Sequence, residues 1–305
     1  ETGMVYVARG DYRQARRSYE RAWEMWREGG DLVRQASLLN NLGVLHQQVG
    51  DYENAVECFE EGLLCAQRSG DTHNEALLSL SLGDLYSEVG AWETASYSYR
   101  RAGDLARQLG ERFLINYHVI AEANLALLRG DRLKAQRVLD EAHGMIGPDD
   151  SLYEYGYYRL ARGRLELQDC HLQQAIADLR EAKLRFTQDG HAMESVWSCV
   201  WLAAAQAQAA DLEAARSELQ EALDYAGSVG QAAVVAVWQA RQWLGQLRGQ
   251  AEPKSTVLRL FEKADRLGEQ MPATRRQLRR LARTSETPAP SLTIRAFGPG
   301  QVLLN

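Results

Sequence analysis

The chain has 305 residues, of which 45% are hydrophobic and 25% charged, a composition typical of a folded soluble protein. The net charge of −6 argues against broad nucleic-acid binding, and the 4 cysteines show no CxxC pair or disulfide-framework spacing. No apolar run is long enough to cross a bilayer and no secretory signal opens the sequence, so we expect a cytoplasmic protein. Glu1, Thr2 and Gly3 resemble a cloning remnant.

Turn signals recur along the chain at an interval of 40 residues, beginning at Gly10. Each of these turns is followed five residues later by an alanine, and a second series of glycine turns runs in the same register from Gly30. The first series comprises Gly10, Gly50, Gly90, Gly130, Cys170 and Ala210, with Ala15, Ala55, Ala95, Ala135, Ala175 and Ala215 after them. The regular spacing predicts an internal repeat with two helices in each unit.

The residues at the turns and within the segments have plain physical roles. A glycine after a helix adopts the left-handed cap conformation, and the aspartate that often follows caps the next helix. The segments between turns predict helices of about 17 residues and about 26 Å. Small residues such as Gly43 and Gly83 are expected to lie where a helix crosses large partners, such as Phe59 and Tyr99, on the following helix.

The pattern L-G-x2-Y followed by A-x3-F resembles the tetratricopeptide repeat. It is carried by Leu42, Gly43, His46, Ala55 and Phe59, and again by Leu82, Gly83, Tyr86, Ala95 and Tyr99. The resemblance covers about residues 4–247 and implies an all-α, right-handed superhelical solenoid of helix pairs. The unit of 40 residues, longer than the family's usual 34, is similar to the repeat in the sensor arms of bacterial signal-transduction ATPases, including the maltose-regulon activator.

The repeat register ends near residue 248, so we assign residues 1–248 to a solenoid of about six units. Residues 249–284 are expected to form terminal capping helices with a basic face, made by Arg275, Arg276, Arg279, Arg280 and Arg283. This face fits DNA phosphates or an acidic partner. A solvated helix that caps the solenoid explains it slightly better, because the run is short.

Residues 285–305 read as a linker followed by a β-hairpin, in which Leu292, Ile294 and Ala296 alternate with polar residues before a Gly-Pro-Gly turn. The string LTIRAFGPGQVLLN also resembles the opening hairpin of the winged-helix domain in bacterial activators of the antibiotic-regulator type. This resemblance implies that the sequence stops just inside a DNA-binding domain of a larger parent protein. We expect no direct nucleic-acid binding by the solenoid itself.

The sequence offers no recognisable catalytic chemistry. It contains neither a phosphate-binding glycine loop nor a dinucleotide fingerprint, and its 6 histidines lack metal-ligand spacing. Cys58 and Cys65 lie on one helical face, where two small core thiols explain them better than a redox or metal pair. We therefore expect a non-enzyme without cofactor or metal.

Aromatic residues gather on the first helix of the middle and later units, which in the resembling family lines the concave surface. They suit stacking on sugars, rings or peptide side chains, while neighbouring polar groups orient a ligand. Packing between long helices is the alternative and is expected to account for roughly half of the aromatics. The candidate wall consists of Asn40, Gln47, Tyr117, Asn124, Tyr157, Arg164, Trp197 and Trp201.

The sequence thus predicts the sensor or scaffold arm of a bacterial multidomain transcription regulator. The arm binds an inducer or a peptide segment in its groove and signals to a neighbouring ATPase or DNA-binding domain. The alternative is a freestanding tetratricopeptide adaptor that grips a peptide or protein. A complete winged helix downstream of Asn305 in the parent gene would decide between them.

Overall fold

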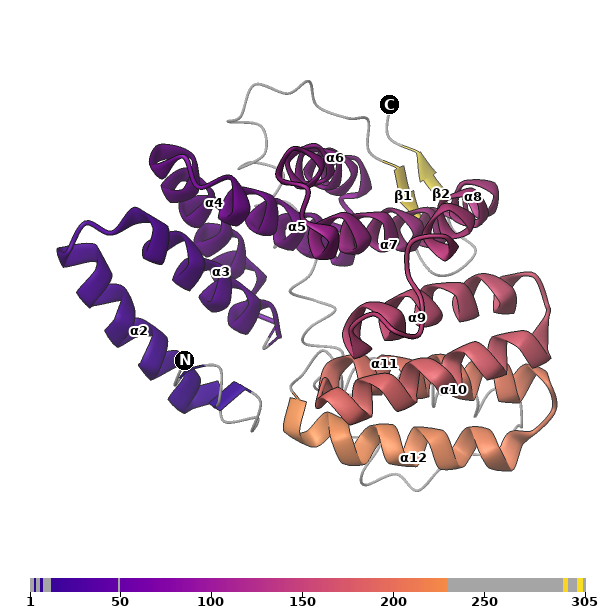
Figure 1. Cartoon of the computed structure of the whole chain (residues 1–305). Coiled ribbons are helices and arrows are strands. Elements are labelled where there is room, and N and C mark those ends of the chain that lie inside the picture. The colour runs from indigo at the N-terminus through magenta and orange to yellow at the C-terminus, as the bar shows by residue number, and fades with distance from the viewer. Residues whose placement is uncertain are drawn as a thin grey trace.

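The structure is a computed structural model that describes residues 3, 6–7, 12–48, 50–229, 293–295 and 301–303. Helices α2 to α12 follow one another as antiparallel neighbours along an arc, from indigo α2 to orange α12 in Figure 1. Their bounds are α2 Tyr12–Glu28, α3 Leu32–Gln48, α4 Tyr52–Ser69, α5 Thr72–Glu88, α6 Trp92–Leu109, α7 Arg112–Arg129, α8 Arg132–His143, α9 Leu152–Gln168, α10 Leu172–Asp189, α11 Ala192–Gln208 and α12 Leu212–Val229. This arrangement confirms the predicted all-α solenoid of helix pairs.

The turns between helices have the predicted chemistry. Gly70 ends α4 at φ 70°, and its amide donates to the carbonyl oxygens of Ala66 and Gln67. Asp71 then caps α5 by accepting a hydrogen bond from the Asn74 amide at 3.1 Å. Where the register lacks glycine, Cys170 and Ala210 adopt the same left-handed conformation, at φ 60° and 64°. The fold therefore keeps the turn even where the local residue disfavours it.

Small residues on the first helix of each unit interlock with large residues on the second. A Cβ added to Gly43 would lie 2.4 Å from the Phe59 ring, and one added to Gly83 would lie 2.3 Å from the Tyr99 ring. The predicted alanines are buried throughout: Ala15, Ala55, Ala95, Ala135, Ala175 and Ala215. The predicted large residues Phe59 and Tyr99 are buried too, as are the residues at the equivalent positions, Tyr19, Leu139, Leu179 and Leu219. The predicted repeat register is confirmed.

The helices form two layers. The first helices of successive units, α3, α5, α7, α9 and α11, contact one another directly, whereas successive second helices from α4 to α12 contact one another less. Closer spacing in one layer bends the array toward that layer. The α3–α11 layer therefore lies on the inner side of the arc in Figure 1.

Helix α8 departs from the expected length. It has 12 residues, whereas the neighbouring helices α7 and α9 have 18 and 17. Asp150 stands where the other units have glycine, and residues 144–151, which include Gly144, Gly147 and Pro148, form a longer connection to α9. Helix α8 also contacts α9 less than any other described second helix contacts its successor, while α7 contacts α9 directly. The joint between α8 and α9 is the loosest in the described array.

Most of the expected C-terminal segments lie outside the described residues, including the basic helices predicted in 249–284. Within 285–305, strand β1 (Thr293–Arg295) pairs antiparallel with β2 (Gln301–Leu303), and Ile294 lies opposite Val302. The predicted hairpin is therefore present, and the winged helix stays a prediction. Each helix in the described part of the chain is too short or too polar to span a bilayer.

Candidate functional site

The inner layer carries a row of half-buried aromatic residues on successive first helices. Tyr117 of α7, Tyr157 of α9 and Trp197 of α11 occupy equivalent positions 40 residues apart. We call the inner wall the side of this layer formed by Asp84, Tyr117, Tyr153, Tyr157, Arg164, Glu194, Trp197 and Trp201. These residues come from four consecutive units, so a molecule that lies on the wall touches several units at once.

Three tyrosines form the centre of the inner wall. The ring centroids of Tyr117 and Tyr157 lie 5.3 Å apart, and those of Tyr153 and Tyr157 lie 5.9 Å apart, both in stacked geometry. Tyr117 and Tyr153 are almost parallel at 6.4 Å, with an interplanar angle of 4°. Because α7 and α9 contact each other directly, the cluster bridges the α7–α8 unit and the α9–α10 unit.

Asp84 of α5 lies beside this cluster with both carboxylate oxygens occupied. Tyr99 Oη donates to Oδ1 and Tyr117 Oη donates to Oδ2, each at 2.7 Å. Burial raises the pKa of Asp84 to about 6, and the two phenol hydrogen bonds, which favour the carboxylate, oppose this shift. Asp84 thereby fixes the orientation of Tyr117 on the wall.

The raised pKa of Asp84 predicts a pH-dependent stability. The folded protein holds the Asp84 proton more tightly than the unfolded chain, so this contribution is complete below about pH 4 and is lost as the pH rises through 6. Asp84→Asn should therefore gain stability relative to the parent by about 2 kcal/mol between pH 4 and pH 7. Urea unfolding at pH 4, 5, 6 and 7 measures this, with the exposed Asp104→Asn as the charge-matched control. A difference between parent and Asp84→Asn that stays flat across this range contradicts the prediction.

A second acid lies at the other side of the tyrosines. Tyr153 Oη donates to Glu194 Oε1 at 3.4 Å, and the Tyr153 ring lies 4.5 Å from the His191 ring. Burial raises the pKa of Glu194, while its own backbone amide and nearby His191 lower it. Glu194 and His191 thus hold Tyr153 from the next unit, as Asp84 holds Tyr117.

Arg164 of α9 is the cation of the inner wall. Its Nη1 donates to Asn124 Oδ1 at 2.8 Å, and its Cζ lies 4.8 Å from the centroid of the Trp201 ring. Burial lowers the pKa of Arg164 to about 10, which leaves it charged at neutral pH. Its Nε is buried without a hydrogen-bond partner. This geometry holds the guanidinium in a fixed position.

The structure brings the predicted site residues together in two groups. Tyr117 and Tyr157 stack, and Asn124, Arg164 and Trp201 form one contact chain. Trp197 packs against the core between α9 and α11.

Asn40 and Gln47 lie further toward the N-terminus and bond to α5 instead. Asn40 is buried and accepts from Ser81 Oγ at 2.8 Å, and Gln47 donates to Glu88 Oε2 at 2.8 Å. Helix packing accounts for some of the aromatic residues on the first helices, because Tyr155 and Tyr158 are buried in the core.

The sequence prediction left out Tyr99, Tyr153, Glu88 and Glu194 as site residues. The repeat register could have indicated Glu194, because Glu194 lies 41 residues after Tyr153. The hydrogen-bonded pair Asn40 and Ser81 has the same separation. Residues 40 or 41 apart face each other between successive first helices. Tyr99 gave no such signal, since it reaches Asp84 from the second helix of its own unit.

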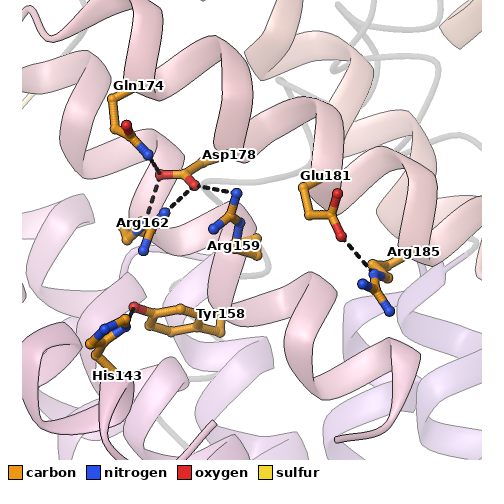
Figure 2. Close-up of polar contacts among 8 residues, drawn as sticks. All are labelled: His143, Tyr158, Arg159, Arg162, Gln174, Asp178, Glu181 and Arg185. Atoms are coloured by element: carbon orange, nitrogen blue, oxygen red, sulfur yellow. Dashed lines mark hydrogen bonds and ion pairs between the residues drawn. The ribbon is translucent and has the colours of Figure 1, made fainter. Parts of the chain in front are cut away.

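The structure also contains a pocket of about 360 Å³ outside the inner wall, between α8, α9 and α10. Its lining includes His143, Tyr158 and Arg162, and Figure 2 shows these residues beside the buried carboxylate of Asp178. Arg162 binds Asp178 through Nε at 2.7 Å and also through Nη2, and Arg159 Nη2 lies 2.9 Å from Oδ1. Both guanidinium groups here already bind the carboxylate of Asp178, so the inner wall is the stronger candidate for a ligand site.

Comparison with known proteins agrees with this architecture. Residues 1–210 match the family described as the MalT-like TPR region. Among solved structures, the chain is similar to BtubC (BKLC) from P. vanneervenii, with 18% identity, a TM-score of 0.50, and coverage of 79% of this chain and 92% of that chain. At this identity the likeness shows the fold alone. The search of curated proteins gave no match.

Proposed function

The chain belongs to the family of MalT-like tetratricopeptide regions, and from this premise we propose that it is the sensor arm of a bacterial transcriptional regulator. In this proposal the inner wall binds a small-molecule inducer or a peptide segment. The bound state is passed to an ATPase and a DNA-binding domain of the same parent chain, in the cytoplasm. The arm itself is non-catalytic.

The continuity of the inner wall is the observation that carries this proposal. The stacked tyrosines belong to α7 and α9, and Trp201, beneath Arg164, belongs to α11. A ligand bound to these residues contacts helices from three consecutive units. Because each unit of a solenoid contacts mainly its neighbours, such a ligand favours one angle between units and shifts the shape of the arm.

Two aromatic truncations test the wall as the inducer site. Tyr157→Ala removes the centre of the tyrosine cluster, and Trp197→Ala removes the equivalent aromatic of the next unit. Because an aromatic pair contributes about 0.5–1.5 kcal/mol beyond the area it buries, each variant should raise the inducer concentration needed for a half-maximal response by about tenfold. The measurements are reporter transcription in the full regulator and tryptophan fluorescence of this chain on titration with the inducer.

The control is Tyr97→Ala, which truncates an exposed tyrosine of the second-helix layer and should leave the response unchanged. Circular dichroism confirms that each variant is folded. A folded double variant of Tyr157 and Trp197 with a normal response would remove the inner wall as the site. Retained binding of a peptide without any transcriptional response would favour the freestanding adaptor instead.

A further inference from the structure

Arg164 differs from the other arginines of α9 because no acidic side chain among the described residues pairs with it. Arg159 and Arg162, on the opposite side of the helix, both pair with the buried carboxylate of Asp178. Arg164 instead has one neutral amide oxygen, that of Asn124, and the face of Trp201. The amide oxygen accepts a hydrogen bond and the indole face attracts the cation, but neither group neutralises the charge of Arg164.

The hydrogen-bonding capacity of Arg164 is mostly unused. A guanidinium has five N–H donors in a planar fork, and only the bond from Nη1 to Asn124 is made within the described part of the chain. The lowered pKa reports the same imbalance, since burial disfavours the charge and no carboxylate offsets it. Among the residues that the structure describes, none supplies an anionic acceptor to the Arg164 guanidinium.

Two acids of the inner layer, Asp84 and Glu88, are in the opposite situation, because each accepts hydrogen bonds from two protein donors. Asp84 accepts from two phenols, and Glu88 accepts from Tyr52 Oη and from Gln47 Nε2 at 2.8 Å. Their charges are already held by protein donors. An incoming ligand therefore meets satisfied acceptors at Asp84 and an unsatisfied cation at Arg164.

The surroundings of Arg164 favour a flat ring next to that anion. Tyr157 lies seven residues before Arg164 on the same face of α9, close enough for the charge of each to influence the other. Trp201 holds the guanidinium from the next unit and Trp197 lies one turn before it. A ligand whose ring lies against these aromatic faces can place an anionic substituent of that ring at the Arg164 guanidinium.

We infer that Arg164 anchors the carboxylate or phosphate group of a small ring-bearing ligand whose ring lies against Tyr157 and Trp197. The inference rests on the proposed function and specifies the chemistry of its ligand. Trp201 and Asn124 hold the guanidinium in place, so little side-chain freedom is lost when the oxyanion binds. A paired set of N–H donors suits either oxyanion.

The test uses simple probes on the whole 305-residue chain. Benzoate and phenyl phosphate carry both features, while benzyl alcohol carries only the ring and inorganic phosphate only the charge. Quenching of tryptophan fluorescence reports binding, and Trp201→Phe assigns the signal to the wall. We expect the two aromatic anions to bind about tenfold or more tightly than benzyl alcohol or inorganic phosphate.

Arg164→Gln should weaken the binding of the two aromatic anions by about tenfold or more and leave the affinity for benzyl alcohol unchanged. Arg164→Lys should restore part of the lost affinity. The matched control is Arg34→Gln, because Arg34 also lies over a tryptophan, Trp26 at 4.2 Å, but pairs with Asp31. Circular dichroism and melting confirm that each variant is folded.

The outcomes separate this inference from the proposed function. Equal affinity of Arg164→Gln and the parent for phenyl phosphate would overturn the anion anchor. If Tyr157→Ala and Trp197→Ala still abolish the inducer response in that case, the wall remains the sensor site with a neutral ligand. Loss of anion binding in Arg34→Gln to the same degree as in Arg164→Gln also overturns the inference, because it shows a non-specific charge effect.

Discussion

Asp178→Ala is expected to lower the free energy of unfolding by about 3–5 kcal/mol, because it leaves two guanidinium groups without their shared carboxylate. The Asp178 side chain is 0% exposed and binds Arg162 and Arg159, with Gln174 at 3.4 Å (Figure 2). Burial alone would lower the pKa of Arg162, but the bonds to Asp178 raise it overall. Urea unfolding at pH 7 measures the loss.

The control for Asp178 is Asp104→Ala, which removes an exposed aspartate paired with Arg107 three residues away. Such surface pairs contribute little, so its effect should stay below about 1 kcal/mol. A second comparison replaces Asp178, Arg159 and Arg162 together by apolar residues. This triple variant should recover much of the lost stability, since no unpaired charge remains buried. Equal stability of Asp178→Ala and the parent would show that water reaches the arginines.

Phe59→Ala should lower the free energy of unfolding by about 3–5 kcal/mol, because a fully buried ring is lost from the interlock with Gly43. The interlock also predicts a strong coupling. In the parent, Gly43→Ala is destabilising because its Cβ would lie 2.4 Å from the Phe59 ring. In the Phe59→Ala background that Cβ has room, so Gly43→Ala should be neutral or stabilising there.

A double-mutant cycle of thermal or urea unfolding measures this coupling. Additive effects of the two substitutions would mean that Gly43 and Phe59 do not meet at the helix crossing. The equivalent pair Gly83 and Tyr99 provides an internal repeat of the experiment in the next unit. Agreement between the two cycles would show that the same contact recurs along the array.

The sequence predicted the fold well because each unit repeats the same local signals. Gly70 with Asp71 shows why: one residue ends a helix, the next caps another, and both roles depend only on local backbone geometry. Gly43 and Phe59 are likewise fixed by the register. The early end of α8 does not follow from the repeat, because Asp150 replaces the glycine of the other units and the helix ends instead before the local breakers Gly144, Gly147 and Pro148.

The candidate wall was predictable only as a row of positions. The repeat placed Tyr117, Tyr157 and Trp197 in line, but it gave no information on hydrogen bonds between units. That Asp84 holds Tyr117, or that Arg164 lacks an acid, depends on side-chain directions across helices that are 33 to 40 residues apart in sequence. Such contacts follow from packing rather than from local propensity.

The loose joint between α8 and α9 has a mechanical consequence for the arm. Where few contacts resist bending, the array is most compliant, and here the outer layer contributes least to its stiffness. The tyrosine cluster lies on the inner side of this joint, with Tyr117 on one unit and Tyr157 on the next. Opening or closing the joint changes the gap between these rings. In the proposed function, a ligand that contacts both rings would set the angle at this joint, and a small change of that angle would displace the far ends of the segments α2–α8 and α9–α12.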